Sequence, residues 1–61
     1  MGTANRLVEA RAGKDRKEVA NAVGITLSAL SMYENGHRIP RDEIKVRLAN
    51  FYHKTVQELF F

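Results

Sequence analysis

The sequence predicts an all-α fold, a compact bundle of five short helices over residues 1–61. Apolar residues recur at helical spacing, capping residues precede the apolar stretches, and no stretch has the alternation of a strand. A chain of 61 residues without cysteine has no disulfide or thiolate-bound metal, so helix packing or dimerisation must supply its stability. We therefore expect a single domain with no metal and no cofactor.

Caps and breaks set the expected helix boundaries. Asp15, Thr26 and Thr55 can each accept a hydrogen bond from a free amide in a first helical turn, and Thr55 with Glu58 has the spacing of a capping box. Gly24 suits the left-handed conformation that often ends a helix. The expected helices cover about 4–12, 16–23, 27–34, 41–52 and 56–61.

Each expected helix carries an apolar stripe that can face a common core. Phe60 and Phe61 are consecutive, and both cannot face inward from one short helix, so we expect one of them on the surface. The candidate core residues are Leu7, Val8, Ala10, Val19, Ala20, Val23, Ile25, Leu30, Tyr33, Ile44, Leu48, Phe51, Tyr52, Val56 and Leu59.

Charge and motif content narrow the class of function. A formal net charge of +3 and a pI of about 9.7 are mildly basic and suit a nucleic-acid partner. No apolar run approaches the ~20 residues of a membrane span, and no signal-peptide pattern opens the chain. The sequence lacks a catalytic Ser, His and carboxylate set and a phosphate-binding glycine loop, so we expect neither enzyme activity nor a small-molecule ligand.

The middle of the chain predicts a helix-turn-helix unit at about residues 16–34. Ala20 is small where two helices cross closely, and Gly24 lets the chain turn within three residues. Leu30, six residues after Gly24, anchors the second helix on the first. This spacing fixes two short helices at a steep angle.

The stretch RKEVANAVGITLSALSMYENGHRIP, residues 16–40, resembles the lambda-repressor and Cro-like (XRE-type) helix-turn-helix regulators. The resemblance continues through RDEIKVRLANFYHKTVQELFF and covers almost the whole chain. In two places the chain departs from the family pattern: Gly13-Lys14 is a shorter connection than is common, and His53 stands where the family often has glycine. The resemblance implies a sequence-specific double-stranded DNA-binding transcriptional regulator, a repressor, in the cytoplasm of a prokaryote or its phage.

In such a regulator the recognition helix, here about 27–34, enters the major groove of DNA. Its nearly uncharged outer face can read base edges through hydroxyl groups and can contact thymine methyl groups. Because no Arg, Gln or Asn precedes Asn35 in this helix, we expect modest specificity or a thymine-rich preference. The candidate base contacts are Thr26, Leu27, Ser28, Ser31 and Met32.

Basic and turn residues on either side of this helix are expected to bind the DNA backbone, which sets position rather than sequence choice. Exposed backbone amides around Gly36 are expected to contribute. The candidate phosphate contacts are Arg16, Lys17, Asn35, Gly36, His37, Arg38 and Arg41. The resemblance also implies a structural ion pair between Arg11 and Glu34, with Arg6 as the alternative partner of Glu34.

The aromatic C-terminus suggests an interface, because an exposed phenylalanine at a chain end favours association. Related regulators bind operators as two-fold dimers, so we expect a weak homodimer through Phe51, Leu59, Phe60 and Phe61. The chain ends just after a fifth helix, which favours a self-contained unit. The alternative function is a protein-interaction module of the same fold, an antirepressor or antitoxin-like adaptor that presents Leu27 and Met32 to a protein.

Overall fold

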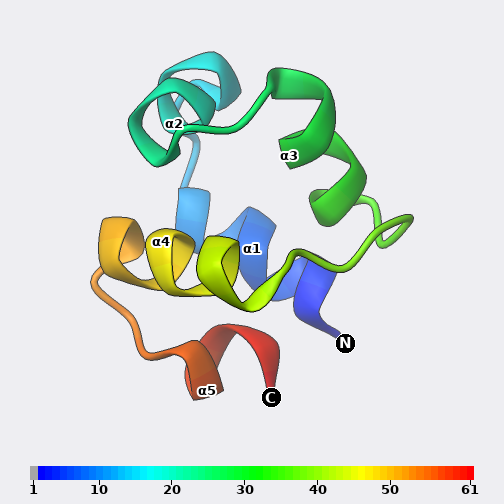
Figure 1. Ribbon diagram of the computed structural model, residues 1–61, viewed down its shortest axis with the longest axis vertical. Coiled ribbons are helices and arrows are strands. Elements are labelled where there is room, and N and C mark those ends of the chain that lie inside the picture. The colour runs from blue at the N-terminus through cyan, green and yellow to red at the C-terminus, as the bar shows by residue number, and fades with distance from the viewer. Residues whose placement is uncertain (1) are drawn as a thin grey trace.

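The computed structural model describes residues 2–61, the side chain of Thr3 excepted, and in these residues it has five helices and no strand. The all-α class is therefore confirmed. Figure 1 shows α4 across the middle of the molecule, α2 and α3 on one side of it and α5 on the other. The helices are α1 (Thr3–Arg11), α2 (Arg16–Val23), α3 (Leu27–Glu34), α4 (Asp42–Tyr52) and α5 (Val56–Phe60).

The expected caps form at the starts of α2, α3 and α5. The Asp15 carboxylate accepts from the Lys17 amide at 3.1 Å, and the Thr26 hydroxyl accepts from the Ala29 amide at 3.0 Å. The Thr55 hydroxyl accepts from the Glu58 amide at 3.0 Å while the Glu58 carboxylate accepts from the Thr55 amide at 2.8 Å. The hydrogen bond from the Thr55 backbone amide, with a further contribution from the Thr55 side chain, stabilises the charged Glu58 carboxylate and lowers the pKa of Glu58.

Left-handed residues end three of the helices. Gly24, after α2, has φ of 86° and Ala12, after α1, has φ of 53°. His53, after α4, has φ of 58°, so the backbone is strained at the position where the family often has glycine. The helix α1 runs from Thr3 to Arg11, one residue earlier at each end than expected.

One hydrophobic core joins all five helices. The expectation for Val8 is wrong: Leu7 is fully buried, but Val8 is 39% exposed because the next residue on α1 lies about 100° further round the helix. Phe60 is 9% exposed and Phe61 is 78% exposed, so one of the two phenylalanines is indeed on the surface. The buried apolar residues are Leu7, Val19, Ala20, Val23, Leu30, Tyr33, Leu48, Ala49, Tyr52, Leu59 and Phe60.

The packing leaves one side of α3 uncovered. The helix α3 packs against α1 and α2, α1 also packs against α5, and α4 packs against α2 and α5. In Figure 1, α2 and α3 lie together at the end of the molecule opposite α5. No helix in the described part of the chain combines the length and apolarity needed to cross a membrane.

Candidate nucleic-acid interface

The turn between α2 and α3 is closed by a single carbonyl. The Ala20 carbonyl accepts from both the Gly24 amide and the Ile25 amide, each at 2.9 Å. Ala20 is 2% exposed and Leu30 is fully buried, so a small residue and an aliphatic anchor hold the two helices together. Three residues, 24–26, join the helices, which is the helix-turn-helix geometry.

The outer face of α3 carries the residues predicted to contact bases. Leu27 and Met32 keep 47% and 42% of their surface exposed, although both are large apolar residues. Leu30 and Tyr33 point into the core from the opposite face of the same helix. Of the predicted set, Thr26, Leu27, Ser28 and Met32 are exposed and Ser31 is half-buried. The structure thus brings these five side chains to the free side of the helix.

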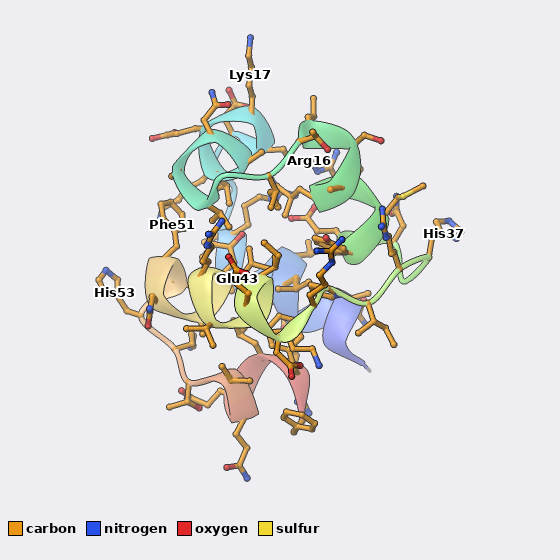
Figure 2. The ribbon with its side chains drawn as sticks, in the orientation of Figure 1. Arg16, Lys17, His37, Glu43, Phe51 and His53 are labelled. Carbon is orange, nitrogen blue, oxygen red and sulfur yellow. The ribbon has the colours of Figure 1, made fainter. Side chains whose placement is uncertain are left out.

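Two grooves with basic walls flank this helix. The α2-side groove, of about 560 Å³, is lined by Arg16 and Lys17 on one wall and by Leu27 and Ser31 on the other. Figure 2 shows Lys17 pointing away from the molecule above α2, with Arg16 between α2 and α3. This groove therefore places two predicted phosphate ligands beside two predicted base contacts.

The loop-side groove, of about 310 Å³, lies on the other side of α3. Thr26 and Ala29 line it from the start of the helix, and Arg38 and Arg41 line it from the chain that leads into α4. Basic residues outnumber acidic ones in both grooves, where Asp15 and Glu43 are the acidic members. A duplex that receives α3 in its major groove therefore meets net positive charge at both flanking backbones.

The turn after α3 differs from the expectation. The Gly36 amide donates to the Tyr33 carbonyl at 3.3 Å and the His37 amide donates to the Met32 carbonyl at 2.9 Å. The Asn35 amide also donates within the helix end, to the Ser31 carbonyl at 2.9 Å. The prediction that these amides are free for phosphate is wrong, because they satisfy the last carbonyls of the helix. The side chains of Asn35 and His37 are exposed.

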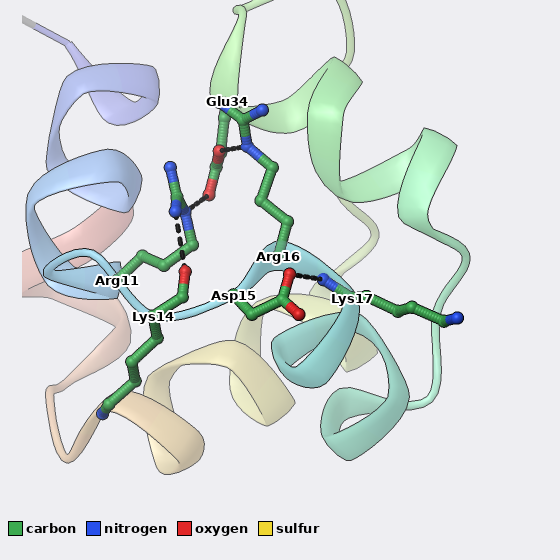
Figure 3. A network of polar contacts seen from close by, with 6 residues as sticks. All are labelled: Arg11, Lys14, Asp15, Arg16, Lys17 and Glu34. Atoms are coloured by element: carbon green, nitrogen blue, oxygen red, sulfur yellow. Dashed lines mark hydrogen bonds and ion pairs between the residues drawn. The ribbon is translucent and has the colours of Figure 1, made fainter.

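A buried carboxylate joins α3 to the start of α2 and the end of α1. Figure 3 shows Glu34 between two arginines. Arg11 Nε donates to one oxygen of Glu34 at 2.8 Å, and Arg16 Nε donates to the other at 2.9 Å. The Glu34 side chain is 1% exposed, the Arg11 side chain 14% and the Arg16 side chain 49%.

This network confirms the pair of Arg11 and Glu34 and adds a member that the sequence did not reveal. The alternative partner is wrong, because Arg6 Nη1 donates to the Glu58 carbonyl at 3.4 Å. From the sequence alone, Arg16 is expected to be a solvent-exposed residue at a helix start. It lies 18 residues before Glu34 in the chain, so no local sequence pattern indicates that the two residues form an ion pair. Folding alone brings these two residues together.

The hydroxyl of Tyr52 lies buried near this network. It has no hydrogen-bond partner in the described part of the chain. Burial raises the pKa of Tyr52 to about 12, with a further contribution from the negative charge of Glu34. The side chain therefore stays neutral beside the charged network. The described residues contain no group of three or more His, Cys, Asp or Glu that could hold a metal ion.

A short helix pair with a three-residue turn, whose second helix projects outward between two basic grooves, defines a helix-turn-helix DNA-binding domain. A family model described as helix-turn-helix matches residues 6–59. The chain therefore belongs to the lambda-repressor-like (XRE-type) helix-turn-helix family and is a DNA-binding regulator of that type. This family consists of DNA-binding regulators rather than enzymes. Comparison with curated proteins found no match.

Proposed function

We propose that the protein is a sequence-specific transcriptional repressor that inserts α3 into the major groove of duplex DNA. One observation carries the proposal: the free face of α3 is uncharged, and arginines line a groove on each side of it. An uncharged face suits base edges, while the flanking cations suit the two phosphate backbones. We further propose that residues 1–61 act as one DNA-binding unit in the cytoplasm of a prokaryote or a phage-infected cell.

The proposed base readers are short or apolar side chains. Ser28 and Ser31 can donate or accept hydrogen bonds at base edges. Leu27 and Met32 are exposed, and with the methyl group of Thr26 they suit the thymine methyl. We therefore expect an operator whose specificity depends on T at one or more positions.

The proposed phosphate ligands fall into two groups on either side of α3. Arg16 and Lys17 serve the backbone beside the α2-side groove, and Arg38 and Arg41 serve the backbone beside the loop-side groove. Near the turn after α3, the exposed side chains of Asn35 and His37 remain proposed contacts. The backbone amides of this turn already donate to carbonyls at the end of α3.

We also propose that the protein binds its operator as a weak two-fold homodimer. Leu59 and Phe60 are buried in the core and Phe51 is half-buried against it, so Phe61 is the exposed member of the expected interface. Phe61 lines an apolar groove of about 450 Å³ together with Ile39, which is 79% exposed. Covering this apolar surface with a second copy removes it from water. The two recognition helices then lie about one DNA turn, ~34 Å, apart.

Selection from a randomised duplex library at two salt concentrations, with the bound stoichiometry measured, tests the proposal. With about four phosphate contacts per subunit, and so about eight per dimer, affinity falls roughly 10⁴-fold between about 50 and 200 mM salt. We expect enriched sites with two similar half-sites and T-dependent positions. Little binding to any duplex at either concentration contradicts the proposal and indicates instead a protein-interaction module that uses Leu27 and Met32.

A further inference from the structure

We infer that Glu34, which does not face the DNA, is a positioning residue for the proposed phosphate contact of Arg16. This inference rests on the proposed function and deepens it. The carboxylate would hold the Arg16 guanidinium at the edge of the α2-side groove, so that a phosphate completes an alternating chain of charges from Arg11 through Glu34 and Arg16.

The geometry allows Arg16 to bind both groups at once. A guanidinium has five N–H donors in a fixed plane, and only the Nε donor of Arg16 is used by Glu34, at 2.9 Å. Within the described part of the chain, no hydrogen bond involves Nη1 or Nη2 of Arg16. The side chain is 49% exposed, so those donors are accessible from the groove.

The charge balance leaves Arg16 free to attract an anion. Arg11 and Glu34 are the buried members of the network, and their opposite charges offset each other at 2.8 Å. The Arg16 charge is then the net charge of the network, and it lies at the exposed end. A phosphate beside Arg16 therefore meets a positive charge whose orientation is fixed by Glu34, and the charge of Glu34 is already offset by Arg11.

Fixing the side chain in advance strengthens the contact. A free arginine loses rotamer entropy when it is immobilised. Here part of that loss occurs on folding, because the Glu34 side chain is 1% exposed and lies in the last turn of α3. Glu34 thereby ties the direction of a backbone contact to the helix that reads the bases.

A double-mutant cycle with duplex DNA tests this coupling. We expect Arg16→Ala to weaken binding about tenfold per bound subunit in the wild-type background, the size of one charge-assisted hydrogen bond, and to lower the salt slope by about 1 per subunit. In the Glu34→Gln background the same substitution is expected to cost less than about twofold, because Arg16 is no longer held in place.

Lys17 is the matched control, because it lines the same groove but has no bond to Glu34. Lys17→Ala is expected to cost the same factor in both backgrounds. The inference is overturned if Arg16→Ala lowers DNA affinity by the same factor in both backgrounds. It is also overturned if Glu34→Gln by itself binds DNA more tightly than the wild type. A gain in affinity would mean that Glu34 competes with phosphate for Arg16.

Circular dichroism establishes whether Glu34→Gln is folded, and Arg16→Lys decides the question if it is not. Lysine keeps the charge but lacks the planar donor set that binds two anions at once. We expect Arg16→Lys to bind DNA as weakly as Arg16→Ala; wild-type affinity for this variant would overturn the inference. If the wild type binds no duplex at low salt, the proposed function is overturned as well. If the variants bind DNA but the effects of Arg16→Ala and Glu34→Gln on affinity are additive, only the positioning role of Glu34 is overturned.

Discussion

At the scale of single residues, backbone strain after α4 is the clearest cost in this structure. His53 has φ of 58°, a conformation that costs about 1–2 kcal/mol for residues with a side chain. We expect His53→Gly to raise the free energy of unfolding by about 1 kcal/mol, because glycine adopts this conformation without the clash. Urea denaturation followed by circular dichroism measures the change.

Two variants show whether this gain comes from the local backbone. Ala12 has φ of 53° after α1, so Ala12→Gly is expected to stabilise in the same direction. Lys54 follows His53 and is not among the residues with positive φ, so Lys54→Gly is expected to destabilise through added freedom in the unfolded chain. A gain at Lys54 equal to that at His53 would contradict the explanation by strain.

At the scale of the helix elements, Thr26 has one established role and one proposed role. Its hydroxyl caps α3 through the Ala29 amide, and its methyl group is a proposed thymine contact. Thr26→Ser keeps the hydroxyl and removes the methyl group, so we expect unchanged stability and about a fourfold loss of preference at one operator position. Thr26→Ala is expected to lower the free energy of unfolding by about 1 kcal/mol.

Thermal denaturation and binding to operator variants measure the two effects separately. If Thr26→Ser loses as much stability as Thr26→Ala, the hydroxyl does not supply the cap energy. If Thr26→Ser retains the full preference at every operator position, the methyl group makes no base contact. The pair of variants thus separates a folding role from a reading role at the N-terminus of α3.

The same elements show what the sequence can predict. The bounds of α2 and α3 follow from residues next to them in the chain, since Asp15, Gly24 and Thr26 act on amides and carbonyls within a few residues. The sequence wrongly predicts Val8 in the core because α1 is short and its apolar stripe is weakly marked. The hydrogen bonds of the Gly36 and His37 amides do have a signature in the sequence, because Gly36, with φ of 75°, is the left-handed glycine that often ends a helix and turns the following amides back to its last carbonyls.

At the scale of the whole molecule, the sequence predicts the outward face of α3 better than the charges around it. The face follows from helical spacing, because Leu30 and Tyr33 must point to the core. The partner of Arg16 depends on how three helix ends meet in space. Long-range polar contacts of this kind require the packed fold, so the α2-side groove and the pairing of Arg16 with the buried Glu34 carboxylate emerge only from the structure.

The proposed dimer is also a property of the whole molecule, and Phe61 tests it. This residue is 78% exposed beside the apolar groove that includes Ile39. Because burying a phenylalanine side chain is worth about 1.5–3 kcal/mol, we expect Phe61→Ser to raise the dimer dissociation constant by roughly 10- to 100-fold. Analytical ultracentrifugation of the free protein measures that constant.

Leu27→Ser is the matched control, since Leu27 is an exposed apolar residue on α3, away from this groove. It should leave the dimer constant unchanged and weaken DNA binding, whereas Phe61→Ser should weaken binding to two half-sites more than binding to one. The difference arises because a dimer gains from both half-sites only while its subunits hold the recognition helices at the operator spacing. The dimer proposal is contradicted if the wild-type protein binds operators strictly as a monomer at every concentration. If the Phe61→Ser variant dimerises like the wild type, the apolar groove is not part of the dimer interface.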